Sequence, residues 1–178
     1  ASSYTISDSA SAVLGDTDTA IDAGVSAINV EDVVDAGVGV QLGALEENLK
    51  LESGSGSDVV FDVADSAANI VTNADGLDNA RDITVYDTVN GYVSNASMSQ
   101  ASTIEGINNT GETTYNIFDT AENLFDLQTY WSEAQIQGYR EKISGLNETV
   151  TYEQIKQYVE LLPSVTMTNP GSEDMISI

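Results

Sequence analysis

The stretch Tyr115–Phe125, YNIFDTAENLF, decides the fold that this chain is expected to adopt. Its first residues are mostly aromatic or β-branched and alternate between apolar and other side chains, the pattern of a short strand. The segment that begins at Thr120 is richer in Ala, Asn and Leu and predicts a short helix. Asp119 stands between the two. The stretch therefore predicts a strand that turns through an aspartate into a helix.

Four other segments align with this stretch without gaps. All five share an aromatic residue or Ile, then Ile or Val two positions later, then Asp after two more: Tyr4–Ala10, Ile28–Val34, Phe61–Ala67, Ile83–Val89 and Tyr115–Ala121. Their aspartates are separated by 24, 33, 22 and 32 residues, so short and long units alternate. A strand and a helix recurring at this interval predict an α/β repeat solenoid over residues 1–126, with stacked parallel strands and helices or turns opposite them.

The chain changes character after residue 126, where Trp131, half of the tyrosines and three of the five cations lie. Two helices are expected to cap the solenoid over residues 127–163, followed by an extended tail over 164–178. The first helix is predicted by apolar residues at helical spacing, namely Ile136, Tyr139, Ile143 and Leu146. The second is predicted by the capping box of Thr151 and Gln154 and by the stop at Pro163.

The composition excludes several classes of function. The chain has 178 residues, 29 acidic and 5 basic side chains and a net charge of −24. Such a surface repels nucleic acid and anionic lipid, because both need Lys or Arg to displace their counterions. Without Cys or His there is no zinc site, Cys nucleophile or Ser-His triad. No apolar run is long enough to span a bilayer, and a start at Ala1 without a signal peptide predicts a processed product or a fragment.

The repeated aspartates have three interpretations. The first makes them N-caps of the helices that follow, since Asp accepts the free N–H groups of a first helical turn. It concerns all five residues: Asp8, Asp32, Asp65, Asp87 and Asp119. The second is a ladder of carboxylates that binds calcium between stacked strands. The third, a catalytic pair of acids, is disfavoured because a motif repeated five times is typical of framework, and no catalytic residue is assigned.

One further segment bears on calcium. Ser53–Phe61, SGSGSDVVF, nearly fits the calcium-binding nonapeptide G-G-x-G-x-D-x-U-x, with Ser53 in place of the first Gly. A Gly/Ser surface loop is the alternative interpretation. The candidate calcium ligands are accordingly Asp58, Asp65, Asp87 and Asp119, and calcium is the one cofactor predicted.

The phrases YNIFDTAENL, FDVADSAANI and YTISDSASAV resemble the Asp-Thr-Ala-x-Asn-Leu repeats of very large secreted bacterial proteins, the repeats-in-toxin-type adhesins and surface-layer-like proteins. The nonapeptide-like segment is similar to their calcium motif. The acidic-then-apolar ending Glu173–Ile178 is similar to the C-terminus of type I secretion substrates. The resemblance implies a bacterial protein located outside the cell or at its surface.

The expected function is that of an extracellular structural or adhesive protein that associates with itself, end to end, into a fibre or surface layer and is stabilised by calcium. Tyr4 and Ile6 are the predicted self-association residues, because the first strand has no evident cap and an unpaired strand is a template for another subunit. A carbohydrate- or ligand-binding module is the alternative. A polysaccharide-cleaving enzyme ranks last, because cations are scarce before Arg140.

Overall fold

The structure is a computed structural model of the 178-residue chain. It describes residues 4–15, 25–53, 58–125, 138–139, 141–146, 150–151 and 175–176. Most of the described chain lies between residues 4 and 125.

The N-terminal part of the chain alternates strands and helices. The strands are β1 (Tyr4–Asp8), β2 (Val25–Val34), β3 (Asp58–Asp65) and β4 (Ile83–Asp87), and each is parallel to the next. The helices between them are α1 (Ala10–Gly15), α2 (Ala36–Ser53) and α3 (Ala67–Thr72), the last followed by the short 3-10 helix η1 (Ala74–Gly76). We refer to a strand together with the helix that follows it as a strand–helix unit.

A hairpin interrupts the fourth unit. After β4 the chain turns at residues 88–91 and returns as β5 (Tyr92–Val93), antiparallel to β4 with Tyr86 opposite Val93. Ser94 then donates its N–H to the carbonyl of Val85 at 2.8 Å, and β6 (Asn95–Ala96) continues beside the sheet. The interrupted strand therefore resumes at β6, and the helix of this unit is α4 (Met98–Glu105).

The next strand pairs first with β4 and then with β6. Its first part, β7 (Thr113–Thr114), is parallel to β4, and its second part, β8 (Asn116–Asp119), is parallel to β6. Helix α5 (Ala121–Phe125) follows, and β9 (Ile143–Leu146) pairs in parallel with the free side of β8. The result is a six-stranded sheet in the order β1-β2-β3-β4-β5, with β7 on β4, and a three-stranded sheet in the order β6-β8-β9.

The predicted alternation accounts for the core. Every second residue of the inner strands is buried, and Phe61, Val63, Ile83, Val85, Tyr115 and Ile117 are each at most 3 % exposed. Helices supply the other wall of this core through Ala36, Leu42, Ile70, Ala101 and Ile104. Burial of these apolar side chains is the main favourable term that holds the strands and helices together.

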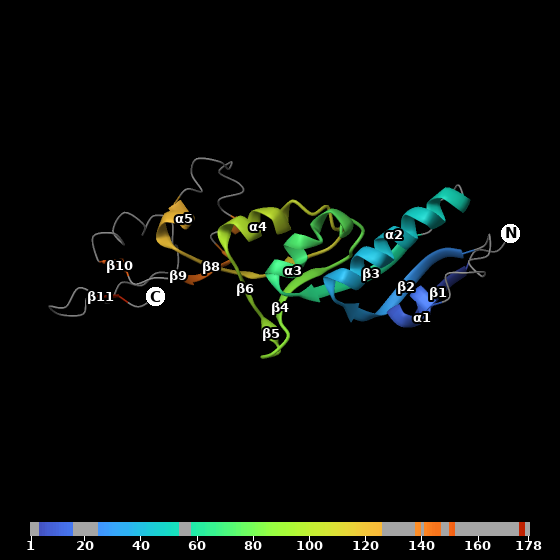
Figure 1. Ribbon diagram of the computed structural model, residues 1–178, viewed down its shortest axis with the longest axis horizontal. Helices are drawn as coiled ribbons and strands as arrows, with labels where there is room; N and C mark the ends of the chain where they lie inside the picture. The colour runs from blue at the N-terminus through green and yellow to red at the C-terminus, as the bar shows by residue number, and fades with distance from the viewer. Residues whose placement is uncertain are drawn as a thin grey trace.

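Helix α2 packs closely on the third unit because two glycines face it. A Cβ at Gly39 would meet Leu77 at 2.9 Å, and a Cβ at Gly43 would meet the carbonyl oxygen of Gly76 at 2.8 Å. Both positions lie on one face of α2, one turn apart. Figure 1 shows α2, α3, α4 and α5 along one side of the strands, with the β4–β5 hairpin projecting on the other. Among the described helices, none combines the length and apolar character that crossing a membrane requires.

The predicted α/β repeat solenoid is wrong. The described chain is a mixed α/β fold, in which one antiparallel hairpin enters a mostly parallel six-stranded sheet and the later strands form a separate sheet. The prediction assumed five equivalent corners, but Asp87 lies in a hairpin rather than at a strand-to-helix corner. The units also differ in size, since α2 has 18 residues and α5 has 5.

Within the predicted helical cap over 127–163, residues 138–139 are helical, but the helix predicted at Ile143–Leu146 is wrong. Ile143–Leu146, assigned above to a helix, is the strand β9, because it completes the sheet on the edge of β8. Val150–Thr151 forms β10, antiparallel to β11 (Met175–Ile176). The rest of the two predicted helices and most of the predicted tail lie outside the described residues.

Candidate functional site

Asp65 joins two strand–helix units through its two carboxylate oxygens. Oδ1 accepts hydrogen bonds from the N–H of Ser66 at 2.7 Å and from Nδ2 of Asn69 at 2.8 Å, both within its own unit. Oδ2 accepts the N–H of Ala36, the first residue of α2, at 3.1 Å. The residue is 7 % exposed, and a buried polar side chain needs such hydrogen bonds to offset the loss of water. Asp65 therefore caps the helix of the preceding unit.

Asp119 repeats this arrangement 54 positions later in the chain. Oδ1 accepts hydrogen bonds from the N–H of Thr120 and from Nδ2 of Asn123, each at 2.7 Å. Oδ2 accepts the N–H of Met98, the first residue of α4, at 2.7 Å. Asp119 is also 7 % exposed. The same three kinds of donor thus surround both aspartates, although they lie in different sheets.

The cap of the helix that follows is the next residue along the chain. The side chain of this residue accepts a hydrogen bond from the backbone three positions on, as an N-cap does. This holds for Ser9, Asp35, Ser66, Ser97 and Thr120. The prediction that Asp65 and Asp119 are the N-caps of their own helices is therefore corrected by one residue. We call the residue before each N-cap the corner residue, and in chain order these are Asp8, Val34, Asp65, Ala96 and Asp119.

Asp32 also caps a preceding helix, but it is not a corner residue. Its Oδ2 accepts the N–H of Ala10, the first residue of α1, at 3.0 Å. Strand β2 continues past it to Val34, with a register shift against β3 between Asn29 and Val33. Asp35 is the N-cap of α2 and accepts the N–H of Val38 at 2.9 Å. Strand β2 ends at Val34, so the predicted cap at Asp32 placed the end of this strand two residues too early.

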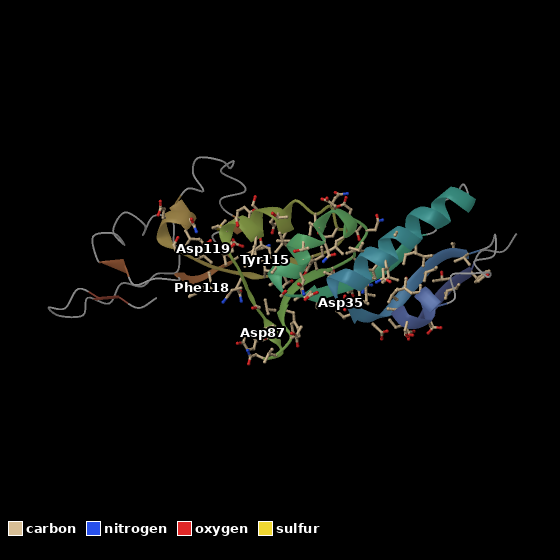
Figure 2. All side chains as sticks on the ribbon, viewed as in Figure 1. Asp35, Asp87, Tyr115, Phe118 and Asp119 are labelled. Atoms are coloured by element: carbon tan, nitrogen blue, oxygen red, sulfur yellow. The ribbon has the colours of Figure 1, made fainter. Side chains whose placement is uncertain are left out.

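Asp87 caps no helix in the described chain. Its Oδ1 accepts the N–H groups of Val89 and Asn90 at 2.8 and 3.0 Å, and its Oδ2 accepts Nδ2 of Asn90 at 2.7 Å. These hydrogen bonds, led by that of the Asn90 side chain, lower the pKa of Asp87 below its usual value. Figure 2 shows Asp87 in the projecting hairpin, separated from Asp35 and Asp119. The five aspartates therefore do not line up as the predicted ladder.

Asp8 is a corner residue at the edge of the six-stranded sheet. Its Oδ1 accepts the N–H of Ser9 at 2.7 Å, the bond that Asp65 and Asp119 make within their own units. Strand β1 pairs only with β2 among the described strands, and no helix precedes it there. Consequently no described helix stands where Oδ2 of Asp8 would cap one. Nearby on β1, Tyr4 is 45 % exposed and Ile6 is partly buried.

The calcium prediction concerns Asp58, Asp65, Asp87 and Asp119. The oxygens of Asp65, Asp87 and Asp119 are occupied by N–H donors, which take the place that a cation would hold. Among the described residues, no three acidic side chains gather as metal ligands do. These three aspartates therefore do not fit a calcium ladder. The side chain of Asp58 lies outside the described residues, and calcium there stays a prediction.

Acidic side chains also connect the loops that precede β4 and β7. Asp78 accepts the N–H of Asn108 at 3.1 Å, and Asp82 accepts the N–H of Glu112 at 2.8 Å. A Cβ at Gly111 would lie 2.1 Å from an oxygen of Asp82, so a side chain there would exclude this contact. Arg81 makes a bidentate ion pair with Asp62 on β3. The acids of this protein thus bind backbone N–H groups of neighbouring units repeatedly.

The cluster of side chains that attaches β9 was not predicted from the sequence. The hydroxyl of Tyr115 donates to Glu105 at 2.6 Å, and Nζ of Lys142 donates to the same carboxylate oxygen at 2.5 Å. Nζ also donates to the carbonyl of Thr113 at 3.2 Å and lies 4.0 Å from the centre of the Tyr115 ring, a cation–π distance. The pKa of Tyr139 is raised to about 12, chiefly because the side chain is buried and also because the charge of Glu105 is near. The cluster ties α4, the strand before β8 and the start of β9 together, and only its charge complementarity was visible in the sequence.

Neither a protein-family model, nor a curated protein, nor a solved structure matches this chain.

Proposed function

We propose that this protein is an extracellular structural protein that associates with itself through the edge of its six-stranded sheet at β1. The observation that carries the proposal is the corner residue Asp8. Its two equivalents, Asp65 and Asp119, each use Oδ2 to cap the helix of the preceding unit. Asp8 has the same position and the same Oδ1 bond, but no preceding unit among the described residues.

The rest of β1 supports association by strand addition. An edge strand presents unpaired N–H and C=O groups, and natural sheets protect such edges with Lys, Pro or a bulge that turns the edge away. Strand β1, Tyr-Thr-Ile-Ser-Asp, has neither Lys nor Pro, and the register shift in its pairing with β2 lies at its first residues, Tyr4 and Thr5. The exposed Tyr4 adds an apolar side chain that a second strand would cover. A partner strand–helix unit would therefore gain backbone pairing, apolar contact and a helix cap at once.

The charge of the chain sets the conditions for assembly. A net charge of −24 makes two copies repel each other, and salt screens charges more than about 8 to 10 Å apart at 0.10 to 0.15 M. Association should therefore be weak at low ionic strength and stronger as sodium chloride is added. Calcium would also promote association, because it would bind between the acidic surfaces of two copies. Calcium is therefore part of this proposal as a bridging ion between molecules.

The experiment is sedimentation velocity of the full chain over a range of protein and salt concentrations, with calcium and EDTA arms. The wild-type protein should form species larger than a monomer, and Asp8→Ala should weaken association about tenfold, because a helix cap and its charge-assisted bond are lost. Glu31→Ala is the matched control, since it removes the same charge from an exposed position on β2. A monomer under all conditions, or equal association by Asp8→Ala and wild type, would contradict the proposal.

A further inference from the structure

The tip of the β4–β5 hairpin holds the pair Asn90-Gly91, and no other asparagine in the chain is followed by glycine. An asparagine side chain is open to attack by the backbone nitrogen of the next residue. Glycine favours this attack, because it has no Cβ to crowd the nitrogen and it leaves the backbone most free to bend. Both residues are exposed, and Figure 1 shows the hairpin projecting from the sheet, so water and hydroxide reach the pair.

Asp87 binds both of the groups that would react. Its Oδ2 accepts Nδ2 of Asn90 at 2.7 Å, and its Oδ1 accepts the N–H groups of Val89 and Asn90 at 2.8 and 3.0 Å. Its backbone carbonyl accepts the N–H of Gly91, the attacking nitrogen, at 2.8 Å. The side chain that is attacked and the nitrogen that attacks are thus bound to different atoms of one residue. The two must approach each other to react, so the turn has to open first.

Two other asparagines donate to an aspartate in the same way but lie in helices. Nδ2 of Asn69 donates to Asp65 at 2.8 Å, and Nδ2 of Asn123 donates to Asp119 at 2.7 Å. The residue after each is Ile or Leu, whose side chain crowds the backbone nitrogen. The N–H of that residue donates at 3.0 Å to the carbonyl four positions before it. These two asparagines are therefore internal references for the pair in the hairpin.

We propose that Asn90 is a site of spontaneous modification, at which it converts to aspartate or isoaspartate, and that Asp87 sets the rate by holding the turn closed. In the open turn the nitrogen of Gly91 bonds to Cγ of Asn90 and loses its proton to solvent. Cγ then releases Nδ2 as ammonia, which leaves a cyclic succinimide. Water adds to either ring carbonyl and breaks the bond from that carbon to the ring nitrogen. The net reaction consumes water and releases ammonia, and no other reactant is needed.

The product loses the contact that closes the turn. Aspartate at position 90 has no side-chain donor for Oδ2 of Asp87 and places a second carboxylate beside it, which repels the first. Isoaspartate also lengthens the main chain of the turn by a methylene group. Among the described strands, β5 pairs with β4 alone and over two residues, so a weaker turn loosens it. The modification is a one-way change that opens the hairpin, and it does not depend on self-association.

The experiment ages the full chain in mildly alkaline buffer and follows position 90 by peptide mass spectrometry, with an isoaspartyl methyltransferase assay for isoaspartate. The reference is a synthetic peptide of residues 83–94, in which no sheet holds the turn. Wild type should convert about tenfold more slowly than the peptide, and Asp87→Ala about tenfold faster than wild type, because hydrogen bonds to a charged acceptor are lost. Glu31→Ala removes the same charge from an exposed position on β2 and should match wild type.

Asp87→Asn is the second variant, because it keeps an acceptor for the N–H groups of the turn without the charge. Its rate should lie between those of wild type and Asp87→Ala, with circular dichroism showing that both variants keep the wild-type secondary structure. Equal rates for wild type and Asp87→Ala would overturn the role of Asp87. A peptide that converts while neither wild type nor Asp87→Ala does so would overturn the site. Conversion of Asn69 or Asn123 as fast as that of Asn90 would overturn its selectivity.

The consequence of the modification has its own test. Asn90→Asp carries the aspartate product from the start and should quicken amide hydrogen exchange at Tyr92 and Val93, while exchange in β3 stays as in wild type. Asn90→Ser is the comparison, since it removes the same amide without adding a charge, and it should quicken exchange less. Unchanged exchange at Tyr92 and Val93 in Asn90→Asp would overturn the claim that the modification opens the hairpin.

Discussion

Asp65 and Asp87 end two neighbouring parallel strands and occupy the same place in the repeated sequence phrase, yet they have different structures. Asp65 is buried and binds donors from two strand–helix units. Asp87 binds only Val89 and Asn90, within its own hairpin. The comparison shows that the residues after an aspartate at a strand end determine which groups it binds. A helix follows Asp65, whereas a hairpin turn follows Asp87.

Those following residues explain the difference. Ser66 after Asp65 is a good N-cap, and two alanines follow it in the first turn of α3. After Asp87 the chain has Asn90-Gly91, a strong hairpin signal. Gly91 has φ +76°, and its N–H donates to the carbonyl of Asp87 at 2.8 Å. The turn therefore closes on Asp87 before any helix can begin.

The largest expected effect is that of Asp65→Ala. It leaves the N–H groups of Ala36 and Ser66 without their acceptor, and the buried site admits little water to replace it. The free energy of unfolding should fall by about 3 kcal/mol, measured by urea denaturation. Asp87→Ala is the matched comparison and should lose only a small part of this, because its donors are open to solvent. Equal losses for the two variants would mean that the buried and the hairpin aspartate are energetically alike.

A smaller effect is expected for Gly91→Ala. A side chain at φ +76° strains the backbone by about 1 kcal/mol, and the added Cβ would meet its nearest atom, the Tyr86 hydroxyl, only at 3.5 Å. Amide hydrogen exchange should quicken at Tyr92 and Val93 and stay unchanged in β3. Gly15→Ala is the control, since its Cβ would meet nothing within 4 Å. Faster exchange throughout β3 would show that the hairpin is needed for the sheet.

The smallest effect is on the titration of Asp87. Its folded pKa is lowered chiefly by Asn90, so the stabilisation from its ionised form is present above the usual value of 3.8 and is lost as the pH falls through the folded pKa. Asn90→Ala should raise the pKa of Asp87 toward 3.8, as followed by NMR of the carboxyl carbon. Val89→Ala keeps its backbone donor and should leave this pKa unchanged. A pKa that does not respond to Asn90→Ala would place the cause elsewhere.

Much of the local structure could be predicted. The repeated phrases lie on strands, and their alternate residues, such as Phe61, Val63 and Ile117, form the core. The helix after Asp119 and the role of aspartate as an acceptor for helix N–H groups followed from residue type and position. Which helix each aspartate caps did not follow, because the preceding helix lies 21 to 29 residues earlier in the chain and reaches the carboxylate only through strand pairing.

The main error came from treating similar phrases as equivalent corners. Asn90-Gly91 is the signal in the sequence that indicates the hairpin, and it lies directly after the aligned phrase Ile83–Val89, where the alignment did not take it into account. Ile143–Leu146 was assigned to a helix from its spacing alone. Its partner is the edge of β8, and the cluster of Glu105, Tyr115 and Lys142 that holds its start is assembled from three elements. Apolar residues at helical spacing over a few positions are weak evidence for a helix, because pairing with the edge of a neighbouring strand can override such a local pattern.

By itself the sequence determined which residues are apolar and alternate, and where strands are followed by helices. It also determined that most acidic side chains must accept hydrogen bonds from backbone N–H groups, because the chain has only five cations. These are local matters of side-chain chemistry and backbone preference. The tertiary structure decided that the strands divide between two sheets, that each buried corner aspartate caps the helix of the unit before it, and that Asp8 is left at an edge. Those outcomes depend on which strands lie side by side, and strand pairing joins residues that no local pattern connects.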